Sequence, residues 1–271
     1  RGFFVLKGLP PFSNMKGKKM RVLFSDLDNT LIYSHRHKIK QPVVLAEMLK
    51  GKEQSFMTEK TYLFFKNQSM FNTVAVTTRT YEQYSRLENL TENINIKDAV
   101  VCNGAFLMHN GNEDKIWTEE SLKISENERP YLFEILNYAN EIVASDSIVE
   151  IMPFMFYIKS DETERIFSLI NEKADKDHVS VLKDARKIYC IVKSINKGNA
   201  VKRYINRFKV DFSISAGDSE FDIPMLKETN ICFCPKEIEN FETKGQKIIC
   251  DGLFSDAVCD GFEEMRKEGK F

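Results

Sequence analysis

Three short apolar runs that each end in polar residues limit what this chain can fold into. The runs cover residues 21–26, 72–78 and 211–218, and helical patterns separate them. Buried β-branched and aromatic runs that alternate with helices predict an α/β fold with a parallel sheet covered by helices. Because ligands of such sheets bind at the carboxyl ends of the strands, the three polar ends predict one shared site.

Composition excludes several classes of function. Of the 271 residues, 42% are hydrophobic and 29% are charged, which is typical of a chain with a full core. The formal net charge of -1 lacks the basic surplus of a nucleic-acid binder, and no apolar run approaches the roughly 18 residues of a spanning helix. We therefore expect no nucleic-acid and no membrane partner. The six cysteines are scattered, which favours reduced core thiols in a cytoplasmic protein.

The pattern changes between the second and third apolar runs. Hairpin-like and aromatic strands such as 150–159 appear there among long helical patterns. We expect an inserted domain over 84–193, between the two parts of a core domain, 20–83 and 194–271. Residues 1–19 carry basic residues and no acid and are interpreted as a leader outside the fold, of uncertain origin.

Two carboxylates, Asp26 and Asp28, follow the first apolar run. Both can face one pocket if the chain unwinds just after Asp26. One carboxylate can then attack while the other handles protons, and a divalent cation can hold a carboxylate and a backbone carbonyl. An acidic turn is the alternative, since Asp and Asn are common turn residues.

The other polar ends supply further candidates. Asp218 ends the third run and Asp222 follows about one helical turn later, so both can point at one cation. The hydroxyl of Thr77 can bind a phosphoryl oxygen, and Lys197 can place its ammonium in the site from the start of a helix. Taken singly, Thr77 is equally compatible with a helix cap, and Lys197 with a solvated lysine.

Together and in this order, these segments resemble the four motifs of the haloacid dehalogenase superfamily of aspartyl phosphatases, and most closely its type-II, Cof-like branch. The matching segments are DLDNTL at 26–31, TTR at 77–79, Lys197-Gly198 and GDSEFDIPML at 217–226, with an Asn-Gly-Ala stretch at 103–105. The resemblance extends from Met20 nearly to the C-terminus. It implies a Rossmann-like parallel-sheet core with an inserted α/β type-II cap domain that closes over the site.

The resemblance also implies roles for the acidic residues. Asp26 would attack phosphorus and form an aspartyl-phosphate, and Asp28 would act as general acid and base. Mg²⁺ would be held by the carboxylates of Asp26 and Asp218 and by the backbone carbonyl of Asp28. Asp222 would either bind the metal as well or contact the residues that bind it. A carboxylate can attack a phosphate dianion only where cations cancel the charge, which Mg²⁺ and Lys197 would do.

The remaining site residues bind phosphate or border the pocket. By resemblance, Thr77 and Lys197 would bind the transferring phosphoryl group. Arg79, Asn103 and Ser219 are expected at the rim of the substrate pocket.

Two residues depart from the pattern of the branch. Phe221 stands where the branch commonly has Asn, which removes a polar contact, and Thr78 stands where it has Gly, which narrows the space beside the phosphate. Segment 32–72 is longer than such a connection needs. We interpret it as a solvated loop followed by a helix rather than as a lid over the site. His35 and His37 lack a third metal ligand and are not expected to bind metal.

The sequence thus predicts a cytoplasmic, Mg²⁺-dependent phosphatase of small phosphorylated metabolites, either sugar phosphates or nucleotide- and cofactor-like monophosphates. A capped site favours small molecules over phosphoproteins. One alternative is a phosphomutase of hexose phosphates, which uses the same two aspartates. The other is a binding or regulatory protein that kept the fold and lost turnover.

Overall fold

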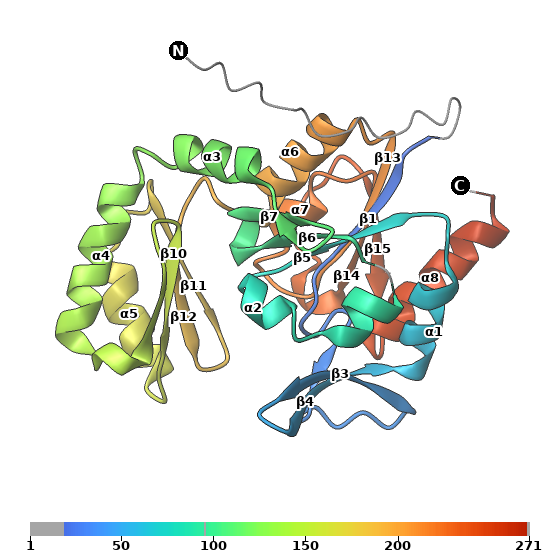
Figure 1. Cartoon of the computed structure of the whole chain (residues 1–271), viewed down its shortest axis with the longest axis horizontal. Helices are drawn as coiled ribbons and strands as arrows, with labels where there is room; N and C mark the ends of the chain where they lie inside the picture. The colour runs from blue at the N-terminus through green and yellow to red at the C-terminus, as the bar shows by residue number, and fades with distance from the viewer. Residues whose placement is uncertain (1–18, 95, 270–271) are drawn as a thin grey trace, which may run out of the picture.

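The computed structural model describes residues 19–94 and 96–269, so nearly all of the expected leader lies outside the described residues. Figure 1 shows a core domain with a smaller domain beside it, joined by two connections. The described chain contains eight α-helices. They are α1 (Glu59–Asn67), α2 (Tyr81–Tyr84), α3 (Lys115–Ile124), α4 (Arg129–Ile142), α5 (Thr163–Lys173), α6 (Lys197–Phe208), α7 (Ile223–Leu226) and α8 (Phe254–Lys267).

The core is built on an eight-stranded sheet in which the predicted strands are neighbours. Its order is β15-β14-β13-β1-β5-β6-β7-β8, and the strands from β15 to β6 are parallel. Their bounds are β1 (Arg21–Ser25), β5 (Asn72–Val76), β6 (Asp98–Val101), β7 (Phe106–His109), β8 (Asn112–Glu113), β13 (Phe212–Ala216), β14 (Ile231–Pro235) and β15 (Gln246–Cys250). Because β1 lies between β5 and β13, the three polar strand ends meet at one edge.

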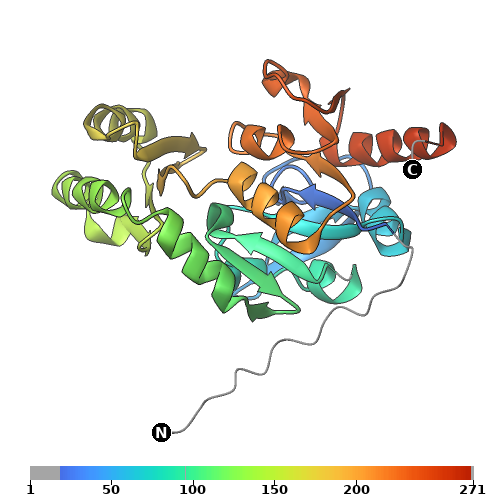
Figure 2. The same cartoon turned by 90° about the horizontal axis from the view of Figure 1, so that it is seen from above.

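Both faces of this sheet are buried, and its central strands carry mostly apolar or small side chains. In β1, Val22 and Phe24 pack toward Tyr204 of α6 and Trp117 of α3. The residue between them, Leu23, packs on the opposite face in the cluster that includes Phe262 of α8. Helices α3 and α6 lie side by side (Figure 2). The continuous apolar runs therefore indicate a sheet covered on two sides, as expected.

The smaller domain is a four-stranded antiparallel sheet backed by α4 and α5. The strand order is β11-β12-β10-β9, with β9 (Ile148–Ile151), β10 (Met155–Lys159), β11 (Val179–Asp184) and β12 (Lys187–Val192). The two helices cover the face turned away from the core (Figure 1). The other face is directed toward the carboxyl ends of the core strands. We call this domain the cap.

The cap begins later than the expected residue 84. Strands β6, β7 and β8 lie within 84–193 but hydrogen-bond to the large sheet, β6 to β5 and β7 to β6. Helix α3 also packs on the core, because the Trp117 indole donates to the carbonyl of Gly104 at 3.1 Å. We therefore propose that the cap comprises residues 125–193.

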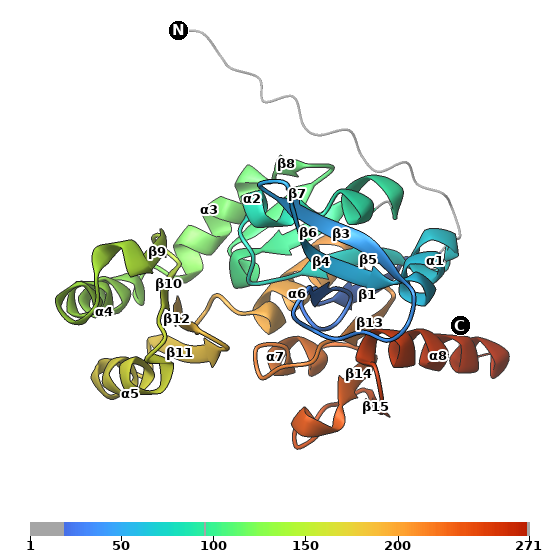
Figure 3. The same cartoon turned by 90° about the horizontal axis from the view of Figure 1, so that it is seen from below.

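Segment 32–72 is not the solvated loop that we expected before its helix. It forms a three-stranded sheet of β2 (Tyr33–Ser34), β3 (Val43–Leu49) and β4 (Lys52–Thr58), followed by the expected helix α1. Lys50 and Gly51 turn the β3–β4 hairpin with φ angles of 52° and 73°. Figure 3 shows this hairpin lying over the end of the large sheet. We call it the flap hairpin.

Two further features bear on the sequence analysis, the absence of long apolar helices among the described residues and the state of the cysteines. Within the described ranges no helix combines the length and apolar character needed to cross a membrane. All six cysteines are free and buried, as their scattered positions indicated. Short 3₁₀ or π turns at Asn89–Asn93, Cys102–Gly104, Ser145–Ser147 and Lys236–Ile238 complete the secondary structure.

Candidate active site

A cavity of about 580 Å³ lies at the carboxyl ends of β1 and β13, between the core, the cap and the flap hairpin. Four of the sequence-predicted residues at its base are Asp26, Asp28, Lys197 and Asp218. The flap hairpin contributes Glu47, Leu49, Gln54 and Ser55, and the cap contributes Tyr157, Asp184, Ala185, Lys187 and Tyr189. A volume of this size fits a small ligand rather than a protein surface.

Lys197 joins two of the predicted carboxylates. Its Nζ donates to Asp26 Oδ1 and to Asp222 Oδ1, each at 2.5 Å, and all three side chains are buried. Lys197 is the first residue of α6, where the Asn196 side chain caps the helix by accepting from Asn199 N at 2.9 Å. Burial alone would lower the pKa of Lys197, but the charges of Asp222 and Asp26 outweigh it and raise that pKa.

Glycines at two positions allow these groups to approach one another. A Cβ on Gly198 would lie 2.5 Å from the carbonyl oxygen of Pro224, so Gly198 lets α6 pack closely against α7. A Cβ on Gly217 would lie 2.3 Å from Cβ of Asp222. The glycines of the third and fourth motifs are therefore explained by packing within the site.

The loop after β13 folds around the carboxylate of Asp222. Its Oδ2 accepts from Asp218 N, Ser219 N and Ser219 Oγ at 2.8–3.1 Å, while Oδ1 is held by Lys197. Both oxygens are thus engaged by the protein. Asp218 instead presents its carboxylate to the cavity, with Oδ1 accepting from Thr30 Oγ1 at 2.8 Å.

The acidic cluster fits a divalent cation. Ligand atoms of Asp26, Asp218 and Asp222 lie within 4.8 Å of one another. Desolvation, together with the neighbouring carboxylates, raises the pKa of Asp26 well above its ordinary value even though Lys197 opposes the shift. Desolvation and the charge of Asp222 raise the pKa of Asp218 to about 7. When all four groups are ionised, three carboxylates and one ammonium leave two uncompensated negative charges, and hard oxygen donors suit Mg²⁺.

Asp28 has a different environment from Asp26. Arg79 donates to it through two parallel hydrogen bonds, Nε to Oδ2 and Nη2 to Oδ1, both at 2.8 Å. Desolvation would raise the pKa of Asp28, but the hydrogen bonds and charge of Arg79, with the charges of Lys187 and Lys197, lower it. The pKa values of the two adjacent carboxylates are therefore displaced in opposite directions, that of Asp26 upward and that of Asp28 downward.

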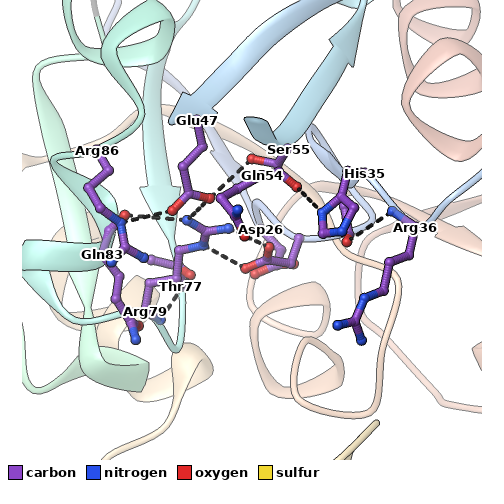
Figure 4. Close-up of polar contacts among 12 residues, drawn as sticks. Asp26, His35, Arg36, Glu47, Gln54, Ser55, Thr77, Arg79, Gln83 and Arg86 are labelled. Carbon is purple, nitrogen blue, oxygen red and sulfur yellow. Dashed lines mark hydrogen bonds and ion pairs between the residues drawn. The ribbon is translucent and has the colours of Figure 1, made fainter. Parts of the chain in front are cut away.

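Arg79 is in turn held by Glu47, a residue that the sequence analysis missed. Arg79 Nη1 donates to Glu47 Oε2 at 2.9 Å, and Arg86 Nε donates to Glu47 Oε1 at 2.9 Å. Figure 4 shows Glu47 reaching from the flap hairpin toward both guanidinium groups, with Ser55 beside it. A carboxylate between apolar strand residues is the signal that would have identified it.

The structure separates the other predicted residues. Arg79 and Ser219 line the cavity, and their contact with substrate stays a prediction. Asn103 does not, which corrects our expectation. Its left-handed backbone, with φ 59°, buries the side chain, and the amide donates to the carbonyl of Ile195. Thr77 is fully buried and its Oγ1 accepts from Arg79 N at 3.1 Å, so its role in binding phosphate stays a prediction.

Thr78 and Phe221, the two departures from the family pattern, contact the same cap residue. Thr78 lies near enough to the hydroxyl of Tyr189 to oppose part of the rise that burial causes in the pKa of Tyr189. The ring of Phe221 meets the ring of Tyr189 edge to face, with centroids 5.3 Å apart. Each substitution therefore replaces a space or polar group near the phosphate site with a contact between core and cap.

The cap face over the cavity combines aromatic rings with one ammonium. Lys187 Nζ lies 5.4 Å from the ring centroid of Tyr157 and 5.9 Å from that of Tyr189. Tyr157 belongs to the aromatic stretch 154–157, and apolar rings in a strand usually form the core of a domain. Phe154 and Phe156 do so, whereas Tyr157 also lines the cavity.

Comparison with known proteins agrees with these motifs. Residues 111–237, which include Lys197, Asp218 and Asp222, match the model of the haloacid dehalogenase-like hydrolase family. Over this segment, a little under half of its length, the chain is similar to haloacid dehalogenase-like hydrolases. The matched segment contains the cap and the third and fourth motifs. The comparison with curated proteins gave no match.

Solved structures share the fold of this chain. The sucrose-phosphatase of Synechocystis sp. PCC6803 is 13% identical, with 92% of this chain and 99% of that chain covered and a TM-score of 0.61. A sugar phosphatase of subclass IIB is 12% identical, with 93% and 100% covered and a TM-score of 0.61. A phosphatase of Bacteroides thetaiotaomicron is 12% identical, with 95% and 99% covered and a TM-score of 0.54. These similarities show the core and cap arrangement.

Proposed function

We propose that this protein is a Mg²⁺-dependent phosphatase of small phosphorylated metabolites that works through an aspartyl-phosphate. The observation that carries the proposal is the buried cluster of Asp26, Lys197, Asp218 and Asp222 with Asp28 beside it at the base of an enclosed cavity. Asp26, Asp218 and the backbone carbonyl of Asp28 would hold Mg²⁺, which would offset the charge of the phosphate when bound.

The protein groups account for the chemistry in two steps. The charge of a bound phosphate dianion would raise the pKa of Asp28 and so favour its protonated form. A carboxylate oxygen of Asp26 then attacks phosphorus while the bond to the ester oxygen breaks, and protonated Asp28 gives its proton to that oxygen. Asp28 then takes a proton from water, whose oxygen attacks phosphorus and breaks the bond to Asp26, so phosphate leaves and Asp26 is restored. Lys197, which lies 2.5 Å from Asp26, stabilises the negative charge of the phosphoryl oxygens.

The enclosure of the site supports a small substrate. The cap and the flap hairpin both line the cavity of about 580 Å³, so water is largely displaced when a ligand fills it. Two proteins with this fold are named as a sucrose-phosphatase and a sugar phosphatase. We propose a sugar phosphate, or a nucleotide- or cofactor-like monophosphate, as the substrate.

The proposal is tested by phosphate release from a panel of these compounds, with Mg²⁺ and with a chelator, beside the Asp26→Asn variant. We expect release that needs the metal and that is lost in the variant. Release that persists in Asp26→Asn would contradict the aspartyl-phosphate mechanism. A folded protein that binds Mg²⁺ but releases no phosphate would instead favour the mutase or the binding protein, and a bisphosphorylated hexose added as activator would distinguish these two.

A further inference from the structure

The flap hairpin places a buried carboxylate over the site by means of a strand irregularity. The register of β3 against β4 shifts between Leu45 and Glu47 and again between Glu47 and Met48. Such bulges redirect a side chain relative to its neighbours. Glu47 is only 4% exposed, whereas the adjacent Met48 is 43% exposed. The bulge thus directs Glu47 into the cavity.

Every polar atom of the Glu47 side chain is used. Oε2 accepts from Arg79 Nη1 at 2.9 Å and from Ser55 Oγ at 3.1 Å, and Oε1 accepts from Arg86 Nε at 2.9 Å. Figure 4 shows these contacts converging on the one carboxylate. A buried carboxylate satisfied in this way holds its partners in one geometry.

Arg79 transmits that geometry to Asp28. The edge of its guanidinium formed by Nε and Nη2 binds Asp28, while Nη1 binds Glu47 and the carbonyl of Gln83 at 3.3 Å. The guanidinium is planar, so its two sides cannot be oriented independently. The Asp28 side chain is 49% exposed and is not fixed by packing, whereas that of Arg79 is 13% exposed. The orientation of the Asp28 carboxylate therefore depends on Arg79, and that of Arg79 depends on Glu47.

We propose that Glu47 is a positioning residue that couples the flap hairpin to proton transfer by Asp28 through Arg79. The inference rests on the proposed function, in which Asp28 protonates the leaving oxygen. Glu47 itself does not touch the reacting atoms. When the hairpin lies over the site, Glu47 fixes Arg79 and so aims Asp28; when the hairpin moves away, this alignment is lost.

The leaving group provides a test that a merely structural role would not pass. An alkyl phosphate such as glycerol phosphate needs protonation of its poor leaving oxygen, whereas 4-nitrophenyl phosphate does not. The variant Glu47→Gln keeps the size of the side chain but removes its charge. We expect its kcat to fall by at least about tenfold on glycerol phosphate and by less than about threefold on 4-nitrophenyl phosphate, because general acid catalysis typically contributes about 10²–10⁴.

Two further variants test the proposal. One is a control for the loss of a carboxylate, and the other tests whether Glu47 acts through Asp28. Glu53→Gln removes a carboxylate from the exposed side of the same hairpin and should leave both rates unchanged. In Asp28→Asn the added change Glu47→Gln should cost nothing further, because its route of action is already absent. An equal loss on both substrates in Glu47→Gln, or additive losses in the double variant, would overturn the proposal.

A measurement without turnover separates this proposal from the proposed function. The Arg79 Nε–H signal in a ¹H–¹⁵N spectrum, assigned by its disappearance in Arg79→Lys, reports the hydrogen bond to Asp28. We expect it to shift in Glu47→Gln and to stay in place in Glu53→Gln. An unmoved signal in Glu47→Gln would overturn the positioning role, even for a protein that releases no phosphate. A shifted signal without phosphate release would contradict the proposed function alone.

Discussion

At the scale of single residues, the ammonium of Lys197 holds together carboxylates that would otherwise repel one another. It lies 2.5 Å from both Asp26 and Asp222 in a fully buried position. A buried charge whose partner is removed is costly, because no solvent replaces the lost contact. The same lysine thus serves both the stability of the site and its chemistry.

We expect Lys197→Met to lower the free energy of unfolding by about 3 kcal/mol, because two buried carboxylates lose their cation. Phosphate release should fall by at least about 10²-fold, since one fixed charge beside the phosphoryl group is lost. Lys202→Met is the matched control on α6, where Lys202 makes an exposed pair with Glu228. Denaturant unfolding and phosphate release test both variants, and a Lys197→Met protein as stable as the control would contradict this account.

The acidic cluster predicts stabilisation by metal. At a Mg²⁺ concentration about 100 times the Kd, binding to the folded state alone adds about 2.7 kcal/mol. We expect Mg²⁺ to raise the Tm of the wild type and to have little effect on Asp218→Asn. Asp251→Asn, a change of an exposed carboxylate away from the cluster, should respond like the wild type. A similar metal response in all three proteins, measured by thermal unfolding, would exclude the cluster as the binding site.

Lys187 predicts a pH dependence of substrate binding. Burial lowers its pKa below the ordinary 10.5, although Asp28 and Asp184 oppose the shift. The ammonium is charged below that pKa and is lost above it, so attraction of a phosphorylated substrate should weaken on the alkaline side. We expect KM to rise with an inflection below pH 10.5. Lys187→Met should have a high KM without this inflection, and Lys159→Met should retain it. An inflection that survives in Lys187→Met would assign it to another group.

At the scale of secondary structure, the strands that could be predicted from the sequence are those whose two faces are both buried. The strands β1, β5 and β13 are buried on both faces by apolar or small side chains, Ser213 and Ser215 among them, so their patterns are unambiguous. The sequence pattern of the flap hairpin is ambiguous. Charged residues such as Lys52 and Glu53 alternate irregularly with apolar ones, and the bulge at Glu47 breaks the two-residue period of a strand. The pair Lys50-Gly51 was the available turn signal. A bulge is fixed by tertiary contacts, which a sequence pattern does not display.

The contacts of Tyr189 predict how β12 is held against the core. Phe221→Leu and Tyr189→Leu each remove the edge-to-face contact between their rings, and we expect each to increase deuterium uptake of the 187–192 segment. The double variant should exchange no faster than Tyr189→Leu, because the ring contact, worth about 1 kcal/mol, is already lost there. Tyr131→Phe, on the stacked pair with His178 elsewhere in the cap, is the control. Additive increases would show that the two residues act separately.

At the scale of the whole molecule, the site is assembled from parts that lie far apart in sequence. Asp26, Asp28 and Asp218 could be predicted because each follows a strand of the same parallel sheet. Lys197 could be predicted because it begins the helix that leads into β13. The cap boundary could not be predicted, since β6 to β8 have the short strands and turns of an antiparallel insertion yet extend the core sheet. The contact of Thr78 and Phe221 with Tyr189 was also beyond prediction, because it depends on how the two domains meet.

The core, the cap and the flap hairpin surround the cavity, and this arrangement predicts that the enzyme selects substrates by size. We expect release from small sugar or nucleotide monophosphates and none from a folded phosphoprotein, because the phosphate of the latter cannot reach Asp26 beneath the cap and the flap hairpin. Inorganic phosphate production from both kinds of substrate measures this, with alkaline phosphatase confirming that the phosphoprotein is cleavable. Comparable rates on both would contradict a closed site.

The buried cysteines have a practical consequence for following the molecule in motion. Burial raises the pKa of Cys102 and of Cys259 to about 12, and none of the six is exposed. A thiol introduced at an exposed cap position such as Glu172, and a second at Lys60 on α1, would therefore react with maleimide dyes far ahead of the native thiols. The natural protein is ready for fluorescence measurements of cap opening without prior removal of its own cysteines.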